Sequence, residues 1–269
     1  VRWLFSAMKA GHAGTLDPLA TGILPIALGE ATKAVPQVQD GTKIYRFSIV
    51  WGRATTTDDR EGEVIATSDI RPERAALEAV LPRFTGAILQ RPPAFSAIKI
   101  AGERAYDLAR AGEAVEIAPR PVEIDAIEVV EHGAEETVLE VTCGKGTYVR
   151  SLARDIAEAL GTRGHVGSLH RAAVGPFTDE DAVTIEELEA AEGAARDALI
   201  LPVAAALADL PEIRLDAGQA GAVANGNPVL LTGAAAPAQL DECWASFRGK
   251  VLATGSVEFG QFKPRRVFH

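Results

Sequence analysis

The sequence predicts an α+β fold in which one large mixed domain is followed by a small β-module. Three observations carry this prediction. Apolar residues alternate with polar ones at 43–50 and 137–143, the period of strands that bury one face. Between Leu152 and Leu160 apolar residues recur every fourth position, which indicates one face of a helix. From about residue 211, short apolar runs alternate with Gly, Asn and Pro, as is typical of small β-domains.

Prolines and glycines mark where the elements begin and end. Pro72 can open a helix, Pro82 can end it, and Gly161 favours the left-handed backbone that terminates helices. In order, we expect a short buried strand or turn at 22–29, a strand at 43–50 with Tyr45, Phe47 and Ile49 on one face, a short strand at 64–65, a helix from Pro72 to Pro82, strands at 122–131 and 137–143, a helix around 152–160, helices within 183–209, and strands at 226–231, 242–247 and 250–256.

Residues 91–121 differ from the segments on either side. They hold four prolines, several basic residues and Tyr106, with only a short helical pattern at 105–110. We therefore expect an inserted arm, and long ordered loops of this kind are often functional.

The change of composition near residue 211 predicts two domains. Residues 1–210 form the large domain, with the arm inside it, and residues 211–269 form the β-module. A module of roughly sixty residues buries a small core, so we expect it to dock on its neighbour.

The charge balance argues against a nucleic-acid binder. The net charge is −10 and the isoelectric point is about 5.1, whereas phosphate contacts depend on Lys and Arg. Composition alone therefore favours solvated surface charges. Basic residues nevertheless recur in three groups: Arg83, Arg91, Lys99, Arg104, Arg110 and Arg120; Lys145, Arg150, Arg154, Arg163 and Arg171; and Lys263, Arg265 and Arg266.

Cys143 and Cys243 lie far apart without metal-ligand spacing, which predicts a reducing compartment with neither a disulfide nor a zinc site. No apolar run is long enough to span a membrane, and the first residues lack a signal-peptide pattern. We therefore expect a cytoplasmic protein. The chain starts at Val1 rather than Met, so we expect it to begin inside a longer gene product.

The most specific motif is the stretch 9–22, which reads KAGHAGTLDPLATG. An Asp-Pro pair alone is commonplace and would make Asp17 a turn former. The whole stretch, however, resembles the aspartate loop of the TruB family of pseudouridine synthases almost residue for residue. Further similarities follow in the same chain order: Lys43-Ile44-Tyr45-Arg46, Ser96-Ala97-Ile98-Lys99, Cys143 to Arg150, and His165 to Arg171.

The resemblance implies a pseudouridine synthase fold with a central, largely antiparallel sheet, an inserted RNA-binding arm and a PUA-like C-terminal module. It implies an enzyme that isomerises uridine 55 in the T arm of tRNA without a guide RNA. It also implies a monomer with no obligatory protein partner. The reaction involves no oxidation, so we expect neither a cofactor nor a metal.

The resemblance makes Asp17 the catalytic carboxylate, either as a nucleophile or as a base towards the sugar. Pro18 restricts the backbone before it and stiffens the loop. A carboxylate in a dry pocket tends to take up a proton, and Arg150 is expected to keep Asp17 ionised through a bidentate contact. Without the motif, Arg150 is as readily a surface residue at a helix start.

The other expected site residues have structural alternatives. Tyr45 is expected to stack on the target base with its phenol near the C5 proton, although the pattern alone makes it a core tyrosine. His12 is expected to contact the RNA or fill the space left by flipped nucleotides, and Asp59 to hold Arg150 or a turn. The remaining expected substrate-binding residues are Lys99 in the arm, Tyr148 and Leu169 as pocket walls, and the basic Arg171.

The chain departs from the family pattern at three places. Thr55-Thr56-Thr57 stands where threonine-aspartate-threonine is common, which removes one possible acidic partner. His170 stands where a second arginine is common, which is expected to make one phosphate contact weaker and dependent on pH. The lysine-proline strand that precedes the aspartate loop is absent from these 269 residues.

Two rival functions remain at this point, and a third can be set aside. A non-catalytic RNA-binding protein could keep the scaffold and dispense with Asp17. The guide-RNA-dependent branch of the superfamily is disfavoured by the arm. Glycoside hydrolysis by Asp58 and Asp59 is disfavoured because adjacent strand residues point to opposite faces, whereas paired carboxylates must flank one sugar.

Overall fold

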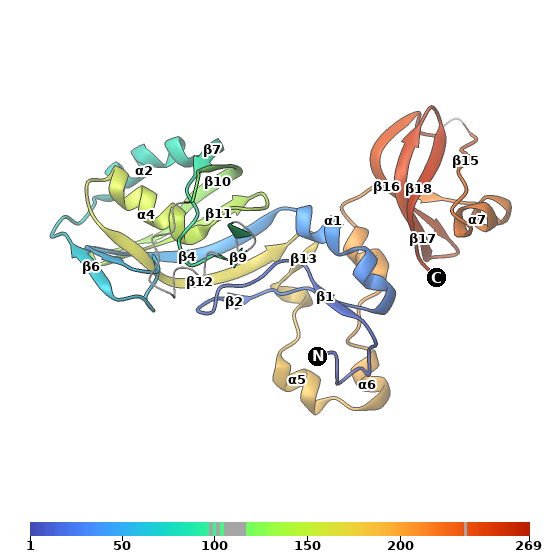
Figure 1. The fold of residues 1–269 in the computed structure, drawn as a ribbon, viewed down its shortest axis with the longest axis horizontal. Coiled ribbons are helices and arrows are strands. Elements are labelled where there is room, and N and C mark those ends of the chain that lie inside the picture. The colour runs from blue at the N-terminus through green and yellow to red at the C-terminus, as the bar shows by residue number, and fades with distance from the viewer. Residues whose placement is uncertain (97–98, 101–102, 105–116, 234–235) are drawn as a thin grey trace. The chain divides into compact units, whose positions relative to one another are not determined.

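The computed structural model describes residues 1–96, 99–100, 103–104, 117–233 and 236–269 (Figure 1). The chain divides into two compact units. One consists of residues 1–15, 23–41 and 174–269, and the other of residues 16–22 and 42–173. The predicted boundary between residues 210 and 211 stays a prediction.

A sheet forms the second unit. Its strands are β2 (Thr21–Gly22), β4 (Lys43–Trp51), β7 (Gly86–Gln90), β10 (Arg120–His132), β11 (Glu136–Cys143) and β12 (Gly164–Val174). The order of the sheet is β13-β12-β4-β11-β10-β7, where β13 is Phe177–Thr178, and β2 pairs with β12. The pairings of β11 with β4 and β10, and of β10 with β7, are antiparallel, and β2 runs parallel to β12. The prediction of a central, largely antiparallel sheet is confirmed.

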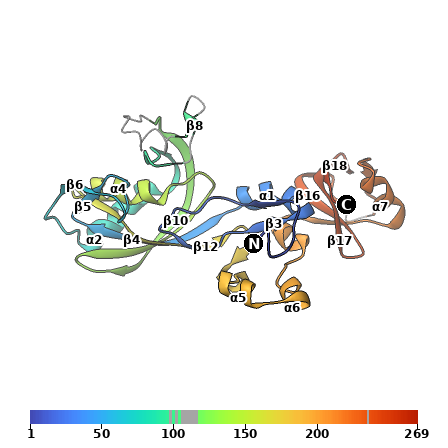
Figure 2. The same cartoon turned by 60° about the horizontal axis from the view of Figure 1, so that its bottom comes forward.

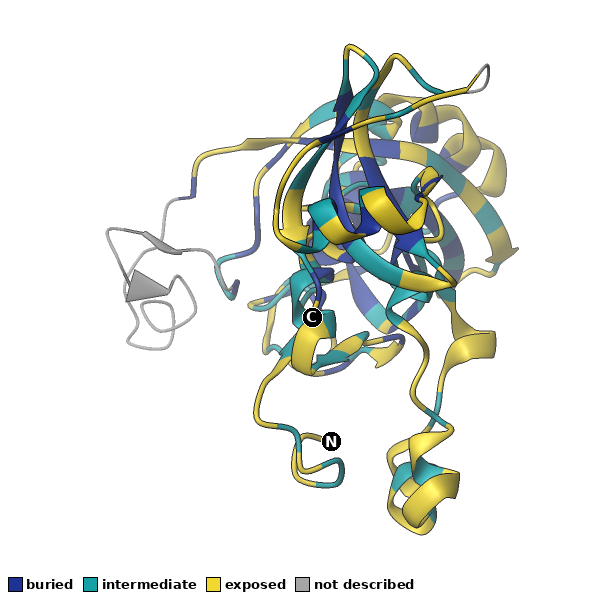
Figure 3. Ribbon diagram, turned by 90° about the vertical axis from the view of Figure 1, so that its right-hand side faces the viewer, coloured by how far each residue is buried: buried dark blue, intermediate teal, exposed yellow. Residues whose placement is uncertain are grey.

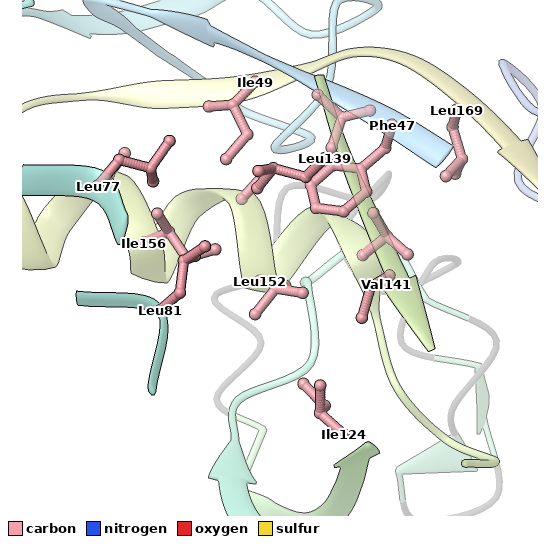
Figure 4. Packing of buried hydrophobic residues seen from close by; sticks show 14 of the residues in the cluster. Phe47, Ile49, Leu77, Leu81, Ile124, Leu139, Val141, Leu152, Ile156 and Leu169 are labelled. Atoms are coloured by element: carbon pink, nitrogen blue, oxygen red, sulfur yellow. The ribbon is translucent and has the colours of Figure 1, made fainter. Parts of the chain in front are cut away.

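The core of this unit lies between the sheet and helix α4 (Val149–Ala159). Phe47 and Ile49 point from β4 towards Leu152 and Ile156 of the helix, and all four side chains are fully buried (Figure 4). Alternation along the strand and fourth-residue spacing along the helix bring these faces together, as the sequence predicts. Each such side chain contributes about 1.5–3 kcal/mol through burial.

The remaining elements of this unit are short. They are β5 (Arg53–Thr55), β6 (Val64–Thr67), α2 (Arg74–Val80), the 3-10 turn η2 (Leu81–Phe84), β8 (Lys99–Ile100) and β9 (Glu103–Arg104). The predicted helix from Pro72 to Pro82 is therefore shorter at its start, and Pro82 lies within η2, where a first turn tolerates a missing N–H. Gly161 has a φ of 72° just past α4, so its prediction as a helix stop is confirmed.

The first unit begins with a two-stranded sheet and several short helices. Its elements up to residue 207 are β1 (Ala10–His12), β3 (Ile26–Leu28), η1 (Gly29–Lys33), α1 (Val35–Asp40), β13 (Phe177–Thr178), η3 (Asp179–Asp181), α5 (Ile185–Ala190), α6 (Gly193–Asp197) and η4 (Val203–Leu207). The prediction of helices within 183–209 is confirmed. Most residues of α5 and α6 are exposed (Figure 3). The predicted strand or turn at 22–29 is β3 with its flanking turns.

The C-terminal residues of this unit form their own sheet, in the order β14-β16-β17-β18-β15. Its strands β16, β17 and β18 and the helix α7 are labelled in Figure 2. Its elements are β14 (Glu212–Arg214), α7 (Ala217–Ala224), β15 (Val229–Leu230), β16 (Gln239–Phe247), β17 (Lys250–Glu258) and β18 (Gln261–Val267). Val257 and Phe262 are fully buried in its core. The strands predicted at 242–247 and 250–256 are confirmed, the one at 226–231 is reduced to two residues, and β14, α7 and β18 were not predicted.

Cys143 and Cys243 are buried free thiols in the cores of the two sheets. Burial raises the pKa of each thiol to about 11. None of the helices in the described part of the chain is long and apolar enough to cross a membrane.

Candidate active site

Asp17 lies in a loop that the second unit holds at two points. Leu19 packs into the hydrophobic core with 9% exposure, and β2, at the end of the loop, pairs in parallel with β12. Between these points the Ala20 N–H donates to the Asp17 carbonyl at 2.9 Å and closes a turn. The loop therefore presents Asp17 from a fixed backbone.

Gly22 makes the close pairing of β2 with β12 possible. Its φ is 98°, a left-handed conformation that side chains rarely adopt. A Cβ at this position would lie 2.3 Å from the Arg171 carbonyl oxygen and 2.8 Å from the Arg171 nitrogen. Because both of these atoms belong to the backbone, no side-chain movement can relieve the clash.

We expect Gly22→Ala to lower the rate of the uridine isomerisation that the resemblance implies, at least about tenfold, because β2 must move away from β12 and Asp17 moves with it. The destabilisation should be about 1–3 kcal/mol, measured by thermal or urea unfolding. Gly86→Ala is the matched control, since Gly86 has a φ of 86° and open space around its missing Cβ. A Gly22→Ala protein as active as Gly86→Ala would contradict the role of this close approach.

Arg150 and Asp17, which are 133 residues apart in the sequence, form a bidentate ion pair. Arg150 Nε donates to Asp17 Oδ2 at 2.7 Å, and Nη2 donates to Oδ1 at 3.0 Å. The Arg150 side chain is 5% exposed and the Asp17 side chain 31% exposed. Two parallel bonds fix the plane of the carboxylate as well as balancing its charge. The site therefore consists of an oriented, partly exposed carboxylate backed by a buried cation.

Arg150 has further partners that fix its own position. Its Nη1 donates to the Thr57 carbonyl at 3.0 Å, and its Nη2 donates to the Phe95 carbonyl at 2.9 Å. Asp59 Oδ2 lies 3.7 Å from Nη1. A buried guanidinium needs most of its donors bonded, and these contacts meet that need. The sequence did not predict the contacts with the Thr57 and Phe95 carbonyls, because every residue type has a backbone carbonyl.

Asp59 is almost fully buried, with 3% exposure. Its Oδ1 accepts from the Thr57 hydroxyl at 2.5 Å and from the Glu61 N–H at 3.0 Å. The absence of an aspartate in Thr55-Thr56-Thr57 thus leaves no gap, since Thr57 contacts both Asp59 and Arg150. Asp59 holds its own turn and adds negative charge behind Arg150.

Asp58 and Asp59 correct one premise of the sequence analysis. They were treated as adjacent strand residues, but Asp58 lies in a bend with a φ of 60° and Asp59 forms an isolated bridge with Val166. This backbone directs Asp58 to Arg154, at 2.8 Å, and Asp59 to Arg150. Burial raises the pKa of Asp58, and the nearby Arg154 partly offsets that rise. The two carboxylates have different arginine partners, which gives no support to a glycosidase pair.

Tyr45 on β4 is partly buried, and its phenol hydrogen bonds to the Arg171 side chain. Arg171 itself is 2% exposed, which makes it a buried partner of Tyr45. Burial raises the pKa of Tyr45, while the contact with Arg171 lowers it to a lesser extent. The phenol is therefore protonated at neutral pH. Leu169, two residues before Arg171 on β12, is 6% exposed and packs into the core.

Tyr148 stands at the start of α4 and is held by Gln90, the last residue of β7. The Gln90 amide oxygen accepts from the Tyr148 N–H at 2.7 Å, and the amide nitrogen donates to the Tyr148 carbonyl at 3.1 Å. Burial raises the pKa of Tyr148, on which the charges of Asp17 and Arg150 also act. Gln90 is fully buried and was missed by sequence reasoning, which gave it no motif.

The remaining predicted residues lie elsewhere or are described only in part. His12 is exposed on β1 of the first unit. Lys99 pairs with Arg104 through the backbone of β8 and β9, and its side chain lies outside the described residues, as does the pattern predicted at 105–110. His170 Nδ1 lies 2.8 Å from the Thr21 hydroxyl, so this histidine contacts the Asp17 loop.

No group of three or more His, Cys, Asp or Glu side chains is arranged as metal ligands within the ranges that the structure describes. The expectation that the reaction needs no metal or cofactor stays a prediction, based on the chemistry of the isomerisation.

Two family models match the chain. Residues 2–149 match the TruB family pseudouridylate synthase (N terminal domain), and residues 150–208 match the tRNA pseudouridylate synthase B C-terminal domain. A protein named tRNA pseudouridine synthase B from Mesorhizobium japonicum is 54% identical, with 100% of this chain and 90% of that protein aligned. One of the same name from Brucella ovis is 55% identical, with 100% and 89% aligned.

Two solved complexes contain chains with a similar fold. A Cbf5-Nop10-Gar1 complex contains a chain with a TM-score of 0.76 and 25% identity, aligned over 100% of this chain and 79% of that one. An H/ACA RNP bound to a substrate RNA containing 2'-deoxyuridine gives a TM-score of 0.77 at 23% identity, over 100% and 78%. The latter similarity concerns the fold alone.

Proposed function

Because the chain belongs to the TruB family of pseudouridylate synthases, we propose that it converts the uridine at position 55 in the T arm of tRNA into pseudouridine. Enzymes of this family isomerise uridine to pseudouridine, and the bacterial relatives are tRNA pseudouridine synthases. The observation that carries the proposal is the partly exposed Asp17 carboxylate, held bidentately by the buried Arg150.

The proposed reaction moves one bond and one proton. The bond from uracil N1 to ribose C1′ breaks, and a bond from C5 to C1′ forms. The C5 hydrogen leaves as a proton and N1 gains one, so the product is an isomer and no electrons are exchanged with a third compound. Asp17 supplies the anionic oxygen towards the sugar, as a nucleophile or as a base. The uridine must first leave its stack to reach this carboxylate.

The neighbouring side chains take roles that follow from their contacts. Arg150 orients Asp17 and stabilises its charge, and Asp59 acts through Arg150 as a positioning residue. Tyr45 stacks on the extruded base, with its phenol oxygen held by Arg171 near the departing C5 proton. Tyr148 and Leu169 form walls of the pocket.

His12 and Lys99 are proposed to contact the RNA, and the C-terminal module to bind it as well. The substrate is tRNA alone, with no guide RNA and no obligatory protein partner, and we propose a cytoplasmic monomer. The identity of 54–55% to bacterial proteins named tRNA pseudouridine synthase B supports the guide-independent branch.

The proposal is tested by tritium release from an unmodified tRNA transcript labelled at uridine C5. We expect the wild-type chain to release tritium without any guide RNA. An otherwise identical transcript with cytidine at position 55 is expected to release none. Equal release from the two transcripts would refute the position, and no release from either, with tRNA still bound, would favour an RNA-binding protein without this activity.

A further inference from the structure

Arg154 lies one helical turn after Arg150 on α4, and each of its nitrogens donates to the protein. Nη1 donates to Asp58 Oδ2 at 2.8 Å, Nη2 to the Arg91 carbonyl at 3.0 Å, and Nε to Asp155 Oδ1 at 2.9 Å. The side chains of Arg154 and Asp58 are 22% and 16% exposed. Arg154 is therefore engaged with the protein more than with solvent.

Arg150 and Arg154 bridge the same two chain segments. Residues four apart on a helix share one face, and here that face lies against the turn 57–59 and the segment 91–95. Arg150 donates hydrogen bonds to the Thr57 carbonyl in the first segment and to the Phe95 carbonyl in the second. Arg154 donates to the Asp58 carboxylate in the first segment and to the Arg91 carbonyl in the second.

The segment 91–95 forms the start of the arm and has a second anchor on α4. The Ser151 hydroxyl donates to the Arg91 carbonyl at 2.8 Å, beside the contact from Arg154. The positive φ of Asp58 sends neighbouring carboxylates to the two arginines. Any movement of either segment away from Arg154 therefore also moves the carbonyls that hold Arg150.

We propose that Arg154 is a positioning residue for the isomerisation: it fixes Asp58 and the Arg91 carbonyl, so that Arg150 holds Asp17 in its reactive orientation. This inference rests on the proposed function. Arg154 does not touch the reacting atoms and acts through the two segments it joins to α4.

The variant Arg154→Gln removes the charge and is too short to reach both segments. We expect the single-turnover rate of tritium release, at saturating enzyme, to fall at least about tenfold, since small misplacements of catalytic groups have effects of that size. The Kd for tRNA should stay within about threefold, because the donors of Arg154 already bind protein groups. Arg154→Lys should recover only part of the rate, since an ammonium cannot reproduce the planar fork.

The matched control is Arg163→Gln. It removes an exposed arginine that lies after the end of α4 and pairs with Glu158 on that helix. It should leave rate, Kd and Tm unchanged. A second readout is independent of activity. The Arg150 Nε–H NMR signal should exchange with water at least about tenfold faster in Arg154→Gln than in the wild type, because its two carbonyl anchors loosen.

Several outcomes would overturn the inference. An unchanged single-turnover rate and unchanged exchange at Arg150 would leave Arg154 without a positioning role. A weakened Kd with a smaller salt dependence, a normal rate at saturation and full recovery by lysine would make Arg154 a phosphate contact instead. A lower Tm with a normal rate per folded molecule would make it purely structural. If the wild type releases no tritium, the proposed function fails and a role of Arg154 in the isomerisation fails with it. The exchange measurement then decides only whether Arg154 fixes the position of Arg150.

Discussion

Asp17→Asn is expected to abolish pseudouridine formation while leaving the fold and tRNA binding in place. The amide is neutral and cannot serve as the nucleophile or base, and only one of its two polar atoms can accept from Arg150. Removal of one member of a catalytic unit typically lowers the rate about 10³-fold or more. Asp17 is partly exposed and Leu19 anchors its loop, so the variant should fold. Tritium release, a thermal melt and a tRNA-binding titration measure the three properties.

Glu140→Gln is the matched control for this change. Glu140 is also a carboxylate paired with an arginine, Arg46, but the pair is exposed on the sheet. Exposed pairs contribute little, so rate and stability should stay near those of the wild type. Substantial release by Asp17→Asn, above about a tenth of the wild-type rate, would exclude a catalytic role for this carboxylate.

Arg150→Lys is expected to have the second largest effect, at least about a hundredfold loss in the rate of tritium release. A lysine keeps the charge but cannot bond Asp17 bidentately and also serve the carbonyls of Thr57 and Phe95. The carboxylate loses its fixed plane, and buried carbonyls lose their donors. We expect a lower free energy of unfolding by about 1–3 kcal/mol, so the rate must be measured per folded molecule.

Arg46→Lys provides the comparison, because Arg46 makes an exposed ion pair with 57% of its side chain accessible. It should behave as the wild type in both rate and Tm. If Arg150→Lys keeps wild-type kcat and loses only Tm, then Arg150 stabilises the fold and has no part in orienting Asp17.

The strands and helices around the core could be predicted because burial has a period. The alternation at 43–50 and the fourth-residue spacing from Leu152 follow directly from which faces meet in the core. The residues at which helices and strands begin and end were less predictable. Pro82 falls inside a 3-10 turn, where local backbone geometry rather than hydrophobic pattern decides the boundary.

Two of the elements missed in the C-terminal module, α7 and β18, have physical explanations. Helix α7 contains two glycines and little amphipathic pattern, and its clearest signal is the capping box of Asp216 and Gln219. Strand β18 contains Pro264 and three basic residues, which argue against a central strand. The neighbouring strand β15 pairs with Gln261 and Phe262 of β18. Pro264 lies beyond these two residues, where its missing N–H costs no hydrogen bond to β15.

The candidate site could be predicted only in part. The motif identified Asp17 and Arg150, but no local pattern indicates that residues so far apart share two hydrogen bonds. The carbonyls of Thr57 and Phe95, and the buried Gln90 amide, are positioned by the fold and have no signature in residue type. Arg154 stood in a basic series and looked like a solvated charge until its partners were known.

Because β2 pairs with β12, the site can form only after β12 has been synthesised. The strand that holds the Asp17 loop leaves the ribosome 149 residues before its partner around His170. Contacts between such distant segments form late, since the intervening chain must fold first. A nascent or truncated chain that stops short of β12 therefore carries the whole aspartate motif without an ordered carboxylate, and it leaves an edge of β4 unpaired and open to aggregation.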